Sequence, residues 1–301
     1  VELALQAGLP IDSFAPRLSF FFNAHIDFFE EIAKLRAARR IWARWMKERY
    51  GAQLERSMQL RFHTQTAGVS LTAQQPEVNI VRTAIEALAG VLGGTPSLHT
   101  NSMDEALALP TEKAARIALR TQQVIAHETN VTHVADPLGG SYFVEELTDE
   151  MERQAEEIFA KLDEFGDGSL LDGVIKGIDE NWFQGRIADS AYELERAFNA
   201  GERVIVGVSG FKEGNDDDDL DILRISNEDE TRQRKRLDAV RLDRDQTAVD
   251  AVLAKLRAEA ADPEVNLMPT LIEASEVYAT LGEMMAAMAD VFGRHTEVPV
   301  I

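Results

Sequence analysis

The sequence predicts an α/β fold followed by a mainly helical extension. In residues 1–140, short apolar runs alternate with amphipathic helical segments at intervals of roughly 40 residues, as in βα units on a parallel sheet. Residues 141–301 are dominated by long helical segments, so we place a domain boundary near residue 140. Three parallel strands can neither close a barrel nor stand alone with both faces covered. We therefore expect the βα part to need more strands upstream of Val1.

Three strand–helix pairs are predicted in the first part. Aromatic density after Pro16 marks the first strand, and Gly51 closes the helix that follows it. The second helix ends at Gly93-Gly94, and the third has Pro110 and Thr111 at its start. The predicted strands are residues 17–22, 59–63 and 97–100, and the predicted helices are residues 26–50, 75–92 and 111–128.

The second part is predicted to be mostly helical. One apolar strand, residues 203–208, interrupts its helices. Helical periodicity covers residues 145–165, 173–198, 228–261 and 268–292. We therefore expect an extension of different architecture and not a continuation of the sheet.

Composition limits the classes of protein to which the chain can belong. A net charge of −21 argues against a nucleic-acid partner, because neutralising phosphates requires a basic face. With 45% hydrophobic residues the chain is too apolar to be disordered, yet it has no uncharged apolar run long enough to span a membrane. The absence of cysteine excludes disulfides and thiolate metal sites. We expect a globular, cytoplasmic protein without a secretory signal.

The surplus of acidic residues has two interpretations. Excess acid with sparse lysine is typical of proteins that live in concentrated salt, and an ordinary acidic surface explains it equally well. The four aspartates at residues 216–219 are interpreted as solvated charge, because Ca²⁺ needs spaced ligands in a shaped loop. The sequence has no histidine spacing typical of a metal motif, so no metal site is predicted.

Polar side chains lie at or near the carboxyl ends of the three predicted strands. They are Arg17 and Ser19, His63 and Gln65, and His99 and Asn101. Alternate side chains of a strand share a face, so Arg17 and Ser19 are expected on one face with Phe21, and His63 on one face with Gln65. In a βα barrel this end carries the site, and several converging polar groups favour a ligand site. His63 and His99 suit either acid–base chemistry or structural hydrogen bonds, and their spacing leaves both open.

Five stretches of the sequence resemble the methylmalonyl-CoA mutase family. They occur in the family's order, and several are highly specific. The stretches are Pro16-Arg-Leu-Ser-Phe-Phe-Phe22, Phe62-His-Thr-Gln-Thr-Ala-Gly68, Asn79-Ile-Val-Arg-Thr-Ala-Ile-Glu-Ala87, Ser97-Leu-His-Thr-Asn-Ser-Met-Asp-Glu-Ala106 and Ala135-Asp-Pro-Leu-Gly-Gly-Ser-Tyr142. The chain resembles the second half of the large catalytic subunit.

This resemblance implies both a fold and an activity. The chain would hold the last three β/α units of a TIM (β/α)8 barrel, followed by the helical extension of the catalytic subunit. The family isomerises the carbon skeletons of acyl-CoA substrates with adenosylcobalamin, here methylmalonyl-CoA to succinyl-CoA. The cofactor supplies the radical. CoA threads the barrel axis, so the inward side chains are expected to be small or polar.

The resemblance also implies roles for individual residues. Arg17 and Ser19 match positions that bind the CoA arm of the substrate, and Phe21 lines the same channel. His63 and Gln65 match the polar groups near the reacting acyl part, which makes them the expected catalytic residues. The expected cofactor-binding residues, near the adenosyl ribose and the corrin, are Gln65, Val69, Asn101, Glu105 and Ala106. On physical grounds alone, an ordinary first-turn helix carboxylate explains Glu105 equally well.

Two residues depart from the family pattern. Val69 stands where many relatives carry a large aromatic residue against the corrin. Pro96 stands where a glutamine is common, which removes a polar contact and an N–H donor.

Other family features are absent from the chain. The residues that recognise the acyl carboxylate and the D-x-H-x-x-G cobalamin motif are missing. The expected partners are therefore a missing N-terminal barrel half and a small cobalamin-binding subunit, besides the acyl-CoA substrate. The alternatives are the large subunit of an isobutyryl-CoA or 2-hydroxyisobutyryl-CoA mutase, or an inactive truncated remnant. The isolated chain is expected to have no mutase activity.

Overall fold

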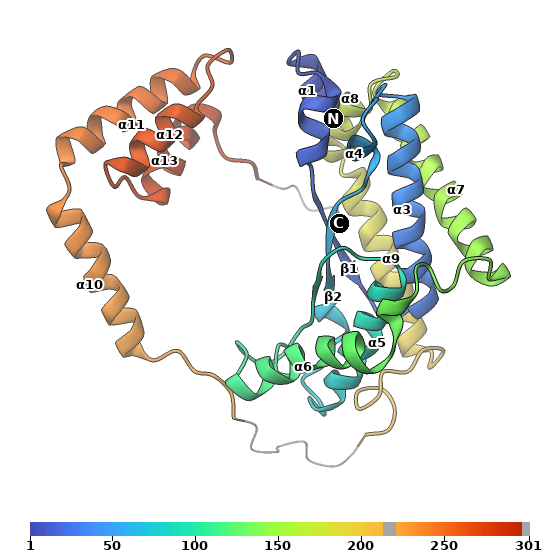
Figure 1. Ribbon diagram of the computed structural model, residues 1–301. Helices are drawn as coiled ribbons and strands as arrows, with labels where there is room; N and C mark the ends of the chain where they lie inside the picture. Colours follow the sequence, from blue (N-terminus) through green and yellow to red (C-terminus); the bar gives the residue numbers. More distant parts are fainter. Residues whose placement is uncertain (213–220, 297–301) are drawn as a thin grey trace. The chain divides into compact units, whose positions relative to one another are not determined.

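The computed structural model describes residues 1–212 and 221–296 (Figure 1). The chain divides into two compact units, Val1–Leu223 and Arg224–Ile301, and each is described by itself. The four aspartates at residues 216–219 lie outside the described residues. The domain boundary expected near residue 140 stays a prediction.

A three-stranded parallel sheet lies in the first unit (Figure 1). Its strands are β1 (Phe20–Ala24), β2 (Phe62–Thr66) and β3 (Leu98–His99), in the order β1-β2-β3. Consecutive strands of the chain are neighbours in the sheet, as expected for successive βα units. The mixed α/β class is thereby confirmed, while closure into a barrel stays a prediction.

The first two strands begin later than predicted. Residues Ala15–Arg17 form a 3-10 turn in which the Leu18 N–H donates to the Ala15 carbonyl at 3.1 Å, so β1 begins at Phe20. Pro16 favours this turn because its ring fixes φ near the helical value. A short helix, α4 (Glu55–Met58), likewise delays β2. As a correction, Arg17 and Ser19 precede β1 and do not lie at its carboxyl end.

Helices connect the strands close to the predicted ranges. They are α3 (Phe28–Glu48), α5 (Val78–Leu92) and α6 (Glu112–Glu128). Leu35 of α3 packs with Leu60 and Phe62 beneath the sheet, and Ile32 of α3 packs with Ala89 of α5. These buried contacts hold the helices against one face of the strands, because burying apolar area is the main stabilising term.

A charged and aromatic interface joins α3 to α7 (Tyr142–Phe165), and the two helices lie side by side in Figure 1. Trp45 of α3 meets Phe159 of α7 edge to face, with ring centroids 4.9 Å apart. The ion pairs are Arg36–Glu145, Arg40–Asp149, Arg44–Glu156 and Arg49–Asp163, with N···O distances of 2.6 or 2.7 Å. The first helix after residue 140 therefore packs directly on the first βα unit.

Between residues 170 and 210 the extension departs from the prediction in two ways. The helix predicted over residues 173–198 is two helices, α8 (Leu170–Asp179) and α9 (Trp182–Asn199). Asn181, with φ of 58°, breaks them in the left-handed conformation that asparagine tolerates. The strand predicted over residues 203–208 is wrong: that segment carries only the isolated bridge between Val206 and Gly210.

The second unit is helical throughout its regular elements. They are α10 (Asn227–Asp243), α11 (Gln246–Ala260), α12 (Met268–Glu276) and α13 (Leu281–Phe292). Two predicted helices are thus each divided, because Asp245 caps α11 and Thr280 forms a capping box with Glu283 at the start of α13. A core that includes Leu256 and Ala274 joins α11 to α13, whereas α10 has no buried residue.

Short elements complete the fold. They are α1 (Glu2–Gln6), α2 (Ile11–Phe14), η2 (Gly68–Ser70) and η3 (Val131–His133). Among the described residues, no helix combines the length and the apolar character needed to cross a bilayer.

Candidate functional site

One face of the sheet is buried, and the other carries residues of the expected site. On β2 the side chains of Phe62, Thr64 and Thr66 are buried, whereas His63 and Gln65 are partly exposed. This alternation follows from the strand geometry, in which successive side chains point to opposite faces. The structure thus places His63 and Gln65 together on the open face, as expected.

An aromatic and polar row crosses this face where β1 and β2 are paired. Phe21 lies opposite His63 in the register, and their ring centroids are 5.2 Å apart. On its other side, His63 Nδ1 lies 2.7 Å from Ser97 Oγ. The imidazole is therefore held between two neighbours at a fixed place on the face.

A second row lies closer to the carboxyl ends of the strands. Asn23, Gln65 and His99 are paired across β1, β2 and β3. The Gln65 Nε2 group donates to Asn101 Oδ1 at 3.1 Å, and the Asn101 N–H donates to Thr66 Oγ1 at 2.9 Å. These hydrogen bonds connect the end of β2 to the segment that follows β3.

Asn101, Glu105 and Gly68 form a polar cradle at this end. Asn101 is 2% exposed, and its Nδ2 donor has no hydrogen-bond partner among the described residues. A Cβ on Gly68 would collide with Oε1 of Glu105 and lie 3.2 Å from Asn101 Nδ2. Glu105 is exposed, yet partial desolvation of its carboxyl and, after it, the charge of Asp104 raise its pKa above the ordinary value.

The floor of the cradle is the turn η2. Val69 at its tip is 85% exposed. Beneath it the fully buried Glu86 of α5 contacts Ser70 Oγ through Oε1. Burial raises the pKa of Glu86 to about 7, although hydrogen bonds from Ser70 and the Ala67 backbone oppose the rise.

Two further side chains of α5 fix the loop between η2 and α5. Asn79 Nδ2 donates to the carbonyls of Thr72 and Met103, at 2.8 and 2.9 Å. Arg82 donates to Asn79 Oδ1 at 2.7 Å and to the Val206 carbonyl at 2.7 Å. The loop after β2, the segment after β3 and residues near 206 are therefore held by one helix.

The expected residues are only partly brought together. The open face and its carboxyl end collect Phe21, His63, Gln65, Val69, Asn101 and Glu105. Ala106 is exposed directly after Glu105. Arg17 and Ser19 are exposed and precede β1, at the opposite end of the strand from the cradle.

Sequence reasoning missed the residues of α5 that support this site. Asn79, Arg82, Thr83 and Glu86 are all buried on a helix rich in alanine, isoleucine and valine. Their spacing of three and four residues places them on one helical face. A polar stripe on an otherwise apolar helix was the signal that could have identified them.

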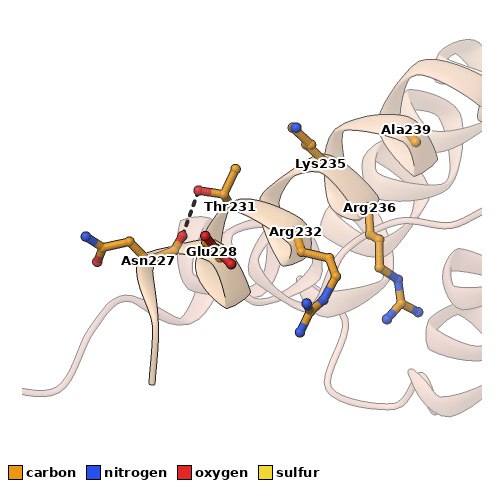
Figure 2. Close-up of a pocket in the computed structure, with 7 residues that line it drawn as sticks. All are labelled: Asn227, Glu228, Thr231, Arg232, Lys235, Arg236 and Ala239. Atoms are coloured by element: carbon orange, nitrogen blue, oxygen red, sulfur yellow. Dashed lines mark hydrogen bonds between the residues drawn. The ribbon is translucent and has the colours of Figure 1, made fainter. Parts of the chain in front are cut away.

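Two other concave surfaces lie apart from these residues. A groove of 720 Å³ between α3, α7, α8 and the buried face of β1 is lined mainly by apolar groups such as Phe20, Trp42 and Phe159. The second is a pocket on α10, whose lining residues are labelled in Figure 2 and come from that one helix: Asn227, Glu228, Thr231, Arg232, Lys235, Arg236 and Ala239. Since one helix supplies all its walls, we assign no ligand to it. The described residues contain no group of three or more histidine or carboxylate side chains that could hold a metal ion.

Comparisons with known proteins give matches along nearly the whole chain. The family model described as methylmalonyl-CoA mutase matches residues 1–294. The 2-hydroxyisobutanoyl-CoA mutase large subunit of Aquincola tertiaricarbonis is 47% identical over 300 residues, 100% of this chain and 52% of that protein. The methylmalonyl-CoA mutase of Rhizobium meliloti is 44% identical over 100% of this chain and 41% of its own length, and the human mitochondrial enzyme is 43% identical over 97% and 38%. The chain spans about half or less of the length of these relatives.

Proposed function

The chain belongs to the methylmalonyl-CoA mutase family, and on that premise we propose that it is part of the large subunit of an adenosylcobalamin-dependent acyl-CoA mutase. The proposed reaction is the isomerisation of methylmalonyl-CoA to succinyl-CoA. The observation that carries the proposal is the polar open face of the sheet, where His63 and Gln65 lead into the cradle of Gly68, Asn101 and Glu105.

The order of residues along the strands supports a position for the substrate. Arg17 and Ser19 precede β1, Phe21 and His63 are paired within the strands, and Gln65 lies two residues further along β2. We propose that the CoA arm lies against Arg17, Ser19 and Phe21, and that the acyl group reaches His63 and Gln65. An arginine is suited to the arm because its guanidinium presents several fixed donors to phosphate or amide oxygens.

The cradle fits an adenosyl ribose and the edge of a corrin. Asn101 has a buried donor without a partner, and the missing Cβ of Gly68 leaves the space that Glu105 occupies. An unpaired donor and a carboxylate match the hydroxyls of a ribose. When bound, adenosylcobalamin supplies the carbon-centred radical. Gln65, Val69, Asn101, Glu105 and Ala106 would hold it, while His63 and Gln65 orient the acyl group.

A second substrate is favoured by one comparison. The relative from Aquincola tertiaricarbonis, at 47% identity, is named a 2-hydroxyisobutanoyl-CoA mutase large subunit. An enzyme of that kind would isomerise a hydroxyl-bearing acyl group with the same radical chemistry. The words "large subunit" also support a separate small subunit, which we propose as the cobalamin-binding partner.

Turnover by the complete enzyme tests these proposals. The large subunit, including the upstream half, is combined with a small cobalamin-binding subunit, adenosylcobalamin and either methylmalonyl-CoA or 2-hydroxyisobutyryl-CoA. Conversion of the first substrate supports the proposed reaction, and conversion of the second alone supports the alternative. Failure with both substrates would contradict the proposed activity and support the alternative of an inactive remnant.

A further inference from the structure

A buried carboxyl contacts the turn η2, which includes Gly68 of the proposed cofactor cradle. Glu86 of α5 is 0% exposed, and its Oε1 contacts Ser70 Oγ in the turn η2. The same Ser70 Oγ lies 2.8 Å from the carbonyl of Ala67, at the start of the turn. Glu86 and Ala67 are therefore bridged by one hydroxyl group.

The protonation state of Glu86 decides whether both contacts can be hydrogen bonds. A serine hydroxyl has one hydrogen, so it can donate to the Glu86 carboxylate or to the Ala67 carbonyl but not to both. A protonated Glu86 removes this conflict, because it donates to Ser70 Oγ and leaves the hydroxyl hydrogen for Ala67. Protonated Glu86 therefore gives each of the two contacts its own hydrogen, whereas ionised Glu86 leaves one hydrogen to be shared between two acceptors.

The surroundings of Glu86 favour the protonated form. Burial raises the pKa of Glu86 to about 7, and it outweighs the hydrogen bonds from Ser70 and the Ala67 backbone, which lower that pKa. Glu31 of α3 adds a like charge, although Lys34 is paired with it, and Arg82 of α5 adds an opposing positive charge. The guanidinium of Arg82 donates instead to Asn79 Oδ1, Thr72 Oγ1 and the Val206 carbonyl.

We propose that protonated Glu86 is a positioning residue, which acts through Ser70 to hold the turn Gly68–Ser70 under Asn101 and Glu105. The turn and the cradle are linked by steric contact, because Gly68 lies against Oε1 of Glu105 and beside Nδ2 of Asn101. A displaced turn would move both groups of the cradle. The consequence for cofactor binding rests on the proposed function, whereas the consequence for the turn does not.

Hydrogen exchange of the turn amides in the complete large subunit tests the first step. Glu86→Gln keeps a donor for Ser70 at all pH values, whereas Glu86→Leu and Ser70→Ala remove the bridge. After correction for intrinsic rates, exchange of residues 67–71 in the wild type should speed up as the pH rises through about 7. Glu86→Gln should abolish this pH dependence, and the other two variants should exchange about fivefold faster at low pH.

Thr148→Val is the matched control, because Thr148 is buried and bonds only the Val144 carbonyl of its own helix α7. It should leave exchange in the turn unchanged. If Glu86→Leu fails to fold, Ser70→Ala, which alters only one hydroxyl of the turn, decides. Unchanged exchange in Ser70→Ala, or identical behaviour of Glu86→Gln and Glu86→Leu, would overturn the proposal.

Cobalamin binding, followed by absorbance in the reconstituted complex, tests the second step. Ser70→Ala should weaken it severalfold and Glu86→Gln should not. Equal affinities in both variants would overturn the role of Glu86 in the cradle. If the wild type binds no cobalamin, the proposed function fails, and the exchange data still decide whether Glu86 holds the turn.

Discussion

Individual side chains of the open face differ in what they contact, and this separates their expected roles. Gln65 is tied to Asn101 at 3.1 Å and lies next to the cradle, while Arg17 is exposed before the first strand. A group that contacts only the CoA arm binds substrate and transition state equally. A group beside the reacting acyl part instead affects how the reacting atoms are placed.

We expect Arg17→Ala and Gln65→Ala to change different kinetic constants of the reconstituted enzyme. Arg17→Ala should raise KM for the acyl-CoA and leave kcat comparatively intact. The expected loss of binding free energy is about 1.5–3 kcal/mol. Gln65→Ala should lower kcat. Steady-state kinetics measure both. A lower Tm for Arg17→Ala with unchanged kinetic constants would identify a structural residue, and a pure KM effect of Gln65→Ala would put Gln65 on the CoA arm.

Glu86 should make stability depend on pH. Its pKa is about 7 in the folded protein and 4.5 as its ordinary value. The folded state therefore binds the proton more tightly, and the stabilisation is present below about pH 4.5 and lost as the pH rises through about 7. The free energy of unfolding should fall by about 3 kcal/mol across this window, and Glu86→Gln should lack that fall. Thermal unfolding of both proteins at about pH 5 and about pH 8 measures it. A constant difference between them would contradict the shift.

At the scale of elements, the contact between α3 and α7 joins a helix of the βα units to the extension. Arg36 is buried at 9% exposure and pairs with both Asp136 and Glu145. Arg153 on α7 makes its pairs with Glu150 and Glu157 of the same helix and is exposed. Substituting each arginine in turn therefore compares an ion pair at the helix interface with ion pairs on the surface of one helix.

Arg36→Ala should destabilise the protein by about 1.5–3 kcal/mol, because it removes charge-assisted hydrogen bonds from α3 to Glu145 of α7 and to Asp136 in the segment before α7. Arg153→Ala should change Tm little, since exposed pairs within a helix contribute little. Thermal unfolding of the two variants compares them directly. Equal losses of stability in the two variants would show that the ion pairs of Arg36 contribute no more than exposed pairs on the surface.

At the scale of the molecule, the three-stranded sheet in the described part of the chain leaves a strand edge unpaired and an apolar groove beside it uncovered. Among the described residues β1 pairs only with β2, and an apolar groove of 720 Å³ runs along its buried face. An unpaired strand edge and an exposed apolar surface favour association. The relatives are about twice as long as this chain or longer, so their remaining residues are available to cover such surfaces.

We expect the isolated chain to self-associate and to have no mutase activity. Sedimentation velocity and an activity assay with adenosylcobalamin measure both properties. Addition of the upstream half should reduce the association, and activity should return only with a cobalamin-binding subunit. Turnover of methylmalonyl-CoA by this chain and adenosylcobalamin alone would contradict the prediction.

The sequence by itself determined the class of the fold and the composition of the open face. Alternating periodicity predicted three strands with helices between them, and the parallel order β1-β2-β3 agrees. The alternation in Phe62–Thr66 was enough to put His63 and Gln65 on one face. Such features depend on local repeats, which a strand or helix expresses wherever it packs.

Only the tertiary structure decided where elements begin and which polar groups are buried. The 3-10 turn Ala15–Arg17 moved Arg17 off β1, and residues 203–208 form no strand. Glu86 is fully buried on α5 and contacts Ser70 of the η2 turn, a contact that the helical periodicity of α5 does not predict. Strand pairing and burial depend on which segments meet in space, and that information is not contained in the periodicity of any one segment.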